Sequence, residues 1–147
     1  MPITIRHARS DDVSAMVGLL GQLFAIEADF EADKQAQARG LSLLLRKEAC
    51  LLVAENDGVV VGMVSIQPLV STAEGGMVGL LEDLVVDEAC RGKGTGSLLL
   101  RAALDWAREQ GLTRVQLLAD RNNAAALHFY SRRNFQSTQL TCLRITH

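Results

Sequence analysis

The chain has little of what marks several classes of protein. Its three cysteines include no Cys-x-x-Cys pair, so the sequence predicts neither a disulfide framework nor a zinc site. The longest apolar run, near Val59 to Ile66, falls well short of the roughly 18 residues that a membrane span needs. A formal net charge of −2 argues against general binding to nucleic acid. No basic-then-apolar signal segment opens the chain, so we expect a cytoplasmic protein with no metal and no membrane contact.

What the chain does contain is enough apolar residues for one domain. Its 147 residues, 48% of them hydrophobic, have the length and composition of a single domain, over residues 1–147, with a substantial core. Apolar periodicity and turn residues predict strands at 3–9, 49–56, 59–68, 77–86, 113–119, 135–138 and 140–146. They predict helices from 10 to about 27, over about 31–46, after the glycine cluster to about 110, and after 123 to about 133. This order indicates an α/β domain with a mixed, mostly antiparallel central sheet of about seven strands and about four flanking helices.

A glycine-rich turn between a strand and a helix is the most informative feature. It lies within Leu81–Leu100, and its residues are Arg91, Gly92, Lys93, Gly94, Thr95, Gly96 and Ser97. Glycines allow positive φ and let a ligand approach the backbone N–H groups closely. The N-terminus of the following helix adds the positive end of its dipole. The turn therefore predicts a site for a diphosphate or another anion, with Arg91 and Lys93 adding charge.

Two common phosphate sites fit this turn poorly. A dinucleotide fingerprint needs G-x-G-x-x-G, and although Gly92 and Gly94 match, the third position holds Ser97. A nucleotide P-loop needs Gly-Lys-Ser/Thr, but Lys93 is followed by Gly94. Neither nucleotide class is favoured.

The turn resembles the Arg/Gln-x-x-Gly-x-Gly/Ala signature of the GNAT superfamily of acetyl-CoA-dependent N-acetyltransferases, through Arg91, Gly94 and Gly96. A second family motif, Asn-x-x-Ala-x-x-Phe/Leu-Tyr, is matched by Asn123, Ala126, Phe129 and Tyr130. The family usually continues with Gly-Phe, where this chain has Asn134-Phe135, and Asn tolerates the same left-handed cap. The resemblance covers the whole chain in element order, and its motifs lie within residues 81–135.

The resemblance implies acetyl-CoA as co-substrate and a splay between the fourth and fifth strands. It implies that the backbone N–H groups of residues 92–97 hold the coenzyme A diphosphate, and that the N–H of Leu84 is the donor to the developing oxyanion. It implies Tyr130 as general acid to the departing sulfur; the alternative is a tyrosine that only packs its helix. The implied cofactor-binding residues are Leu84, Val85, Val86, Arg91, Gly92, Lys93, Gly94, Thr95, Gly96, Ser97, Asn123, Ala126, Phe129 and Tyr130. Asn123 can also act as a helix N-cap.

Glu82 is the candidate general base, acting through a water. In a regular strand it shares a face with Leu84, while Asp83 points the other way. Leucine neighbours would make its carboxylate a stronger base. The alternatives are a carboxylate that pairs with a cation or one that only orients the substrate.

The acceptor is expected to be a primary amine of a small molecule. An acidic run, Glu27, Asp29, Glu31 and Asp33, lies where the resemblance puts the border of the acceptor site, and it is either an attractor for a cationic amine or a solvated helix junction. A homodimer is an expectation from the family. The competing hypothesis is a non-catalytic acyl-CoA-binding sensor or interaction module on the same fold.

Overall fold

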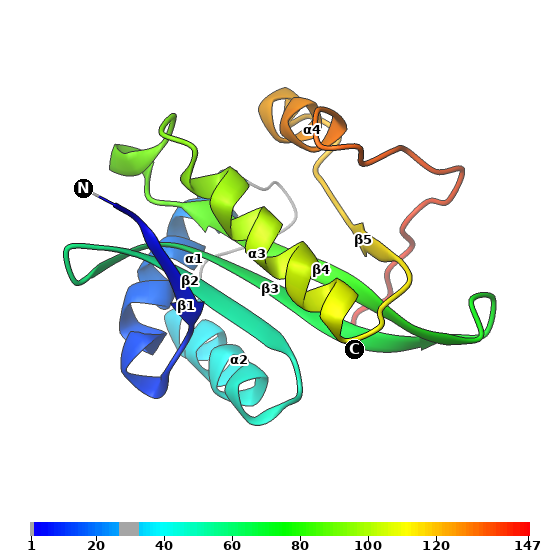
Figure 1. Ribbon diagram of the computed structural model, residues 1–147, viewed down its shortest axis with the longest axis horizontal. Helices are drawn as coiled ribbons and strands as arrows, with labels where there is room; N and C mark the ends of the chain where they lie inside the picture. The colour runs from blue at the N-terminus through cyan, green and yellow to red at the C-terminus, as the bar shows by residue number, and fades with distance from the viewer. Residues whose placement is uncertain (1, 27–32) are drawn as a thin grey trace. The chain divides into compact units, whose positions relative to one another are not determined.

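The computed structural model describes residues 2–26 and 33–147. In this part of the chain the strands are β1 (Thr4–His7), β2 (Cys50–Asn56), β3 (Val59–Ser71), β4 (Gly76–Val86) and β5 (Val115–Leu117). They form one sheet in the order β1-β2-β3-β4-β5 (Figure 1). Neighbouring strands are antiparallel except β4 and β5, which are parallel. The predicted mixed, mostly antiparallel α/β fold is confirmed.

The helices of the described residues are α1 (Val13–Ile26), α2 (Lys34–Arg46), α3 (Thr95–Glu109) and α4 (Ala124–Ser131). Short 3₁₀ helices at Ser10–Asp12 and Glu88–Cys90 precede α1 and α3. Each of the four α-helices lies where the sequence predicted one. None of the described helices has the length and apolar character that crossing a membrane requires.

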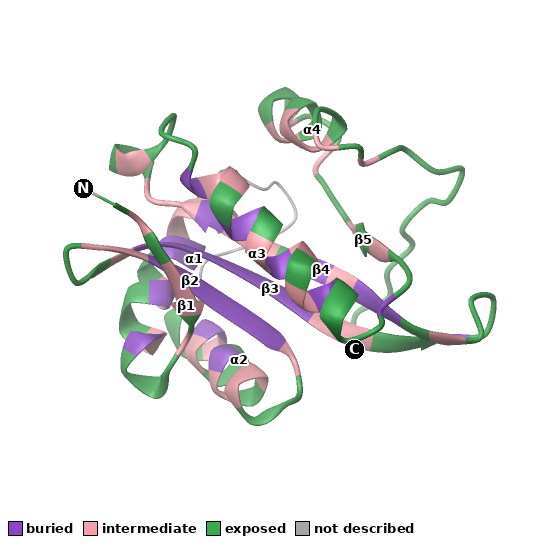
Figure 2. Cartoon of the chain, viewed as in Figure 1, coloured by how far each residue is buried: buried purple, intermediate pink, exposed green. Residues whose placement is uncertain are grey.

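The sheet is covered on both faces by helices. On one face α1 and α2 pack against β2, β3 and β4, and the buried residues of this cluster are Met16, Leu19, Leu20, Leu41, Leu51, Val53, Met63 and Val85. On the other face α3 approaches so closely at Gly62 that a Cβ there would lie 2.8 Å from Leu99 Cδ1. Figure 2 shows the buried residues running along β2 and β3 between these layers. A helix–sheet–helix arrangement thus buries both faces of the central strands.

An ion-pair network ties β1 to the start of the first helix. The Arg6 guanidinium donates to both carboxylate oxygens of Asp12, at 2.8 and 3.0 Å, and to Glu55 Oε1 at 3.2 Å. Asp12 Oδ2 also accepts from the Arg9 backbone N–H at 2.7 Å. The hydrogen bond from Arg6 holds the pKa of the Asp12 carboxyl below its ordinary value, although burial opposes this.

The expectation of about seven strands is wrong for the described residues, which form five. The two predicted strands at 135–138 and 140–146 are not strands in the structure. Alternating apolar residues suggested them, but Leu140, Leu143 and Ile145 are more than 80% exposed. Alternation gives a segment a face to bury, whereas a strand also needs a partner for its backbone groups. The predicted 59–68 strand also runs further, to Ser71.

Contacts divide the chain into two compact units, one ending at Leu117 and the other spanning Leu118–His147. The first contains the whole sheet with α1, α2 and α3, and the second contains α4.

Candidate functional site

The glycine-rich turn links the end of β4 to the start of α3. Gly92 and Gly94 have φ of +81° and +84°, the left-handed region that favours glycine. An ideal Cβ built on either glycine would meet no atom within 4 Å. The backbone is therefore open on the side where a side chain would project. A ligand needs such an opening to reach the N–H groups of the turn.

The N-terminus of α3 is capped without a side chain. Gly94 is the N-cap, and the first helical bond runs from the Leu98 N–H to the Gly94 carbonyl at 3.1 Å. The first-turn N–H groups of a helix have no intrahelical acceptor, and they mark the positive end of its dipole. Arg91 precedes this N-cap by three residues, and its Nε donates to the Val86 carbonyl at 2.9 Å. The geometry fits an anion such as a diphosphate.

The strand before the turn contains a β-bulge. Glu82 pairs with Ser65 and Val85 with Met63, so Asp83 and Leu84 together stand opposite a single residue of β3. Asp83 has φ of +58°, a left-handed conformation that Asp adopts more readily than most residues. A bulge interrupts the ladder of backbone hydrogen bonds and re-aims side chains locally. Both effects fall on the residues for which the sequence predicted catalytic roles.

The bulge corrects two expectations about Glu82. Its cross-strand partner Ser65 lies on the same face of β3 as Met63, the partner of Val85, so Glu82 shares its face with Val85 and not with Leu84. Leucine neighbours do not bury it: Glu82 is exposed, and its Oε1 accepts from Gln67 Nε2 at 3.3 Å. The alternation rule failed here because it assumes a strand without an inserted residue.

Only part of β4 is paired with β5. It pairs with β5 only from Gly79 to Leu81, opposite Val115 to Leu117. Beyond Leu81, β4 continues to Val86 without a recorded β5 partner, which leaves the backbone of Leu84, Val85 and Val86 beside a gap in the pairing. This is the place where a splay between the fourth and fifth strands was expected.

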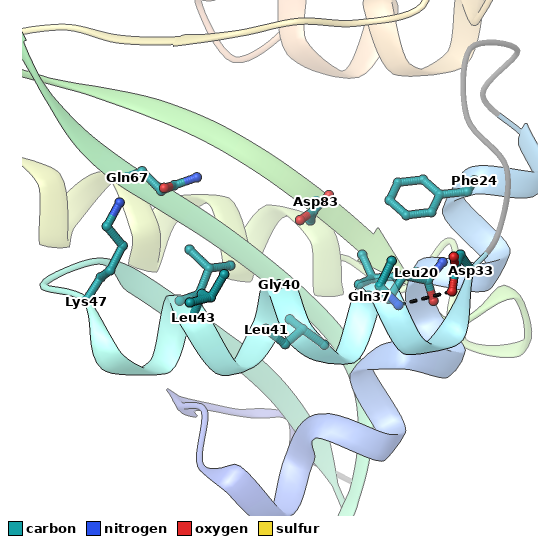
Figure 3. A pocket seen from close by; sticks show the side chains of 12 residues that line it. Leu20, Phe24, Asp33, Gln37, Gly40, Leu41, Leu43, Lys47, Gln67 and Asp83 are labelled. Atoms are coloured by element: carbon teal, nitrogen blue, oxygen red, sulfur yellow. Dashed lines mark hydrogen bonds between the residues drawn. The ribbon is translucent and has the colours of Figure 1, made fainter. Parts of the chain in front are cut away.

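A pocket of about 460 Å³ lies beside this bulge, on the face of the sheet that α1 and α2 cover (Figure 3). Its apolar lining comes from α1 and α2, and its polar lining includes Gln37, Lys47, Gln67 and Asp83. Asp83, which alternation had directed to the other face, lines this pocket, and Gln67 connects it to the carboxylate of Glu82. The full lining is Leu20, Phe24, Asp33, Ala36, Gln37, Gly40, Leu41, Leu43, Leu44, Lys47, Gln67 and Asp83.

Only part of the acidic run is described. Asp33 is the N-cap of α2, and its Oδ1 accepts from the Ala36 N–H at 3.1 Å. Glu27, Asp29 and Glu31 lie outside the described residues. Asp33 thus has a helix-capping role and also lines the pocket.

In the second unit, α4 carries the other motif. Asn123 is its N-cap, with Oδ1 accepting from the Ala126 N–H at 3.1 Å. The Tyr130 ring lies edge-on to those of Phe129 and Phe135, with centroids 5.3 and 5.4 Å apart. Asn134 has φ of +70°, so it does hold the left-handed cap where a glycine is usual.

Comparison with known proteins decides the family. The model of the acetyltransferase (GNAT) family matches residues 19–135, which include both motifs. This chain belongs to the GNAT family.

Curated relatives agree with this membership. The GNAT chain is 28% identical over 134 residues to the uncharacterised N-acetyltransferase YhfO of Bacillus subtilis, covering 91% of this chain and 90% of that protein. It is 29% identical over 139 residues to the aminoalkylphosphonate N-acetyltransferase of Salmonella typhimurium, covering 94% and 88%. Both matches span most of each protein, so the likeness is not confined to the glycine-rich turn.

Solved structures share the fold. A possible acetyltransferase from Clostridium difficile superimposes with a TM-score of 0.87 at 20% identity, covering 100% of this chain and 99% of that one. A predicted acetyltransferase with acetyl-CoA from Clostridium acetobutylicum gives a TM-score of 0.78 at 20% identity, covering 99% and 96%. At this identity the likeness concerns the fold alone.

Four polar residues of the pocket were missed by sequence reasoning: Gln37, Lys47, Gln67 and Asp83. No local signal marks Gln37 on α2 or Gln67 on β3, because only tertiary packing brings them to the same pocket. The only signal for Asp83 was its place beside Glu82 in an otherwise apolar strand, and the alternation rule discarded it.

Proposed function

We propose that this GNAT protein is an N-acetyltransferase that moves an acetyl group from acetyl-CoA directly to a primary amine of a small molecule, in a ternary complex. The observation that carries the proposal is the open, positive-φ glycine turn at the N-terminus of α3. The family uses acetyl-CoA, which supplies the acyl group as a thioester. Every other part of the chemistry is proposed for residues of this chain.

The turn residues would hold the coenzyme. The backbone N–H groups of residues 92–97 would bind its diphosphate, with the charges of Arg91 and Lys93 in support. The assigned residues include Thr95, which is buried, and Gly96 and Ser97 of the first helical turn. Anchoring the coenzyme at this turn would aim its other end along the unpaired part of β4.

The bulged segment of β4 would position the thioester. The backbone of Leu84, Val85 and Val86 lies beyond the last β4–β5 pair, and we propose that the extended arm of the coenzyme would pair with it there. The N–H of Leu84 is our choice of oxyanion donor, and its position in the interrupted ladder supports this. A backbone donor held rigidly in a strand needs no reorganisation when charge develops.

Proton transfer is assigned to Glu82 and Tyr130. As the new C–N bond forms and the C–S bond breaks, Glu82 would take a proton from the acceptor nitrogen through a water. The hydrogen bond from Gln67, which itself lines the pocket, supports a carboxylate held near the acceptor. Tyr130 would donate a proton to the sulfur, and Asn123, Ala126 and Phe129 would line the coenzyme near it.

The acceptor class rests on the pocket and on one relative. The pocket beside Asp83 falls in the volume range of small-molecule sites and carries carboxylates on its lining. The relative from Salmonella typhimurium acts, by its name, on aminoalkylphosphonates, which are small molecules with an amino group. Both favour a small primary amine over a protein acceptor.

Two measurements test the proposal. Calorimetry should detect acetyl-CoA binding, and a thiol assay should detect coenzyme A release when acetyl-CoA is mixed with amines, amino acids, polyamines and aminoglycosides. Absence of acetyl-CoA binding would overturn the proposal. Binding without turnover of any acceptor would favour the non-catalytic acyl-CoA sensor. Whether the chain forms a homodimer can be measured on the same sample by light scattering.

A further inference from the structure

The pocket beneath α2 contains a buried amide without a partner. Gln37 is only 8% exposed and lines the pocket. Within residues 2–26 and 33–147, neither its Nε2 nor its Oε1 has a hydrogen-bond partner. Buried polar side chains are nearly always hydrogen-bonded, because desolvation without a partner is costly. A leucine at this position would fill the space without leaving polar atoms unpaired. The glutamine therefore indicates a ligand that forms the missing hydrogen bonds.

The chemistry of a carboxamide limits what that ligand group is. The Nε2 amide donates and the Oε1 carbonyl accepts, so one ligand group that both accepts and donates satisfies both atoms. A neutral amide or hydroxyl does this. A carboxylate would satisfy only the nitrogen of Gln37, and an ammonium only its oxygen.

The charges around Gln37 also favour a neutral ligand group over an anionic one. Asp33 precedes it by one turn of α2, and Asp83 lines the same pocket from β4. Figure 3 shows Gln37 and Asp33 together at one end of the pocket and Lys47 at the other. Lys47, the C-cap of α2, follows Gln37 by ten positions, about 15 Å along the helix axis. An anionic group at Gln37 would therefore face two carboxylates without the help of Lys47, whereas an ammonium at Asp83 would be stabilised.

We propose that the acceptor is a primary amine whose short carbon chain carries a neutral amide or hydroxyl group, with the ammonium held by Asp83 and the neutral group bound by Gln37. This inference rests on the proposed acetyltransferase function and names its substrate class. Leu20 and Phe24 of the same lining would contact the carbon chain between the two polar ends. An amine without the amide or hydroxyl group would leave Gln37 without hydrogen bonds, and this cost would make it a poorer acceptor.

The first test measures acceptor selectivity. The probes are glycinamide and β-alaninamide, n-alkylamines of equal heavy-atom number, and the acids glycine and β-alanine, each assayed for coenzyme A release at saturating acetyl-CoA. Gln37→Leu should lower the amide-to-alkylamine ratio of kcat/KM by about tenfold or more. Comparing this ratio between wild type and variant cancels differences in the intrinsic reactivity of the amines. Gln35→Leu, the same change at an exposed position of α2, should leave the ratio unchanged.

The second test needs no acceptor. Because Gln37 is buried without a partner, Gln37→Leu should raise Tm by about 2–6 °C while Gln35→Leu changes it little. A Gln37 that has a purely structural role would give the opposite sign, a lower Tm with unaltered selectivity.

The outcomes separate the two proposals. Equal selectivity in wild type and Gln37→Leu, faster turnover of the acids than of the amides, or no turnover of either amide would overturn this inference. Acetylation of other amines in the same assay would still leave the acetyltransferase function standing. Failure to bind acetyl-CoA at all would refute the function itself.

Discussion

Alanine in place of Gly94 tests the proposed coenzyme site most directly. Gly94 has φ of +84° and is the N-cap of α3, while Gly111 has φ of +78° and follows the C-terminal end of the same helix. At both positions an added Cβ would meet no protein atom within 4 Å. The two substitutions therefore impose the same kind of backbone strain, about 1–2 kcal/mol each, without a steric clash inside the protein. For a domain of this length the expected fall in Tm is about 3–8 °C in both variants.

Only one of the two should affect the coenzyme. A methyl group on Gly94 occupies the open side of the turn, where the diphosphate would approach the N–H groups of the first helical turn. Acetyl-CoA affinity, measured by calorimetry below the Tm of both variants, should fall about tenfold or more in Gly94→Ala, which corresponds to about 1.4 kcal/mol. Gly111→Ala should bind as wild type does. Wild-type affinity in Gly94→Ala would refute the reasoning, because it would show that the coenzyme does not approach the backbone closely at Gly94. Equal losses of affinity in the two variants would also refute it, because backbone strain in α3 would then explain the loss.

The remaining predictions concern one catalytic role and two structural groups. Tyr130→Phe should lower kcat about 10²–10⁴-fold with acetyl-CoA affinity and Tm little changed, because the ring contacts remain; wild-type kcat would remove Tyr130 from the mechanism. Asp12→Asn should lower the unfolding free energy at pH 7 by about 2 kcal/mol. Since the pKa of Asp12 is lowered on folding, its contribution is present above the ordinary value of 3.8 and is lost as pH falls through the folded value, so chemical denaturation should show the two proteins converging in acid. Burial raises the pKa of the Cys50 thiol to about 12, so a thiol reagent should label the exposed Cys142 in the native protein and Cys50 only after unfolding; rapid labelling of native Cys50 would contradict its burial.

Features that depend on neighbours in the chain were predicted well. The left-handed caps at Gly94 and Asn134 and the helix start at Asn123 follow from properties of those residues and their immediate neighbours. Strands were predicted at 49–56 and 59–68, and the structure has β2 and β3 there, paired with each other. These features need no knowledge of the distant parts of the chain.

Features that depend on distant partners were predicted poorly. The segment 135–147 has the alternation of strands, yet alternation does not supply a neighbouring strand to pair with. The inserted residue at Asp83 became visible only from the register of β4 against β3, and it reversed the side on which Asp83 was expected. The face that Glu82 and Leu84 were expected to share was assigned on a regular strand, which the bulge interrupts.

The sequence by itself determined the family, the number and order of the helices and the glycine turn that we propose as the coenzyme site, because glycine conformation, capping and helical periodicity act over a few residues. Only the tertiary structure decided that Asp83 lines the pocket, that Gln37 is buried there with no hydrogen-bond partner among the described residues, and that the terminal segment forms no strand. Each of those outcomes depends on which segments far apart in the chain come into contact. Those contacts are set by side-chain packing and by backbone hydrogen bonds between the elements.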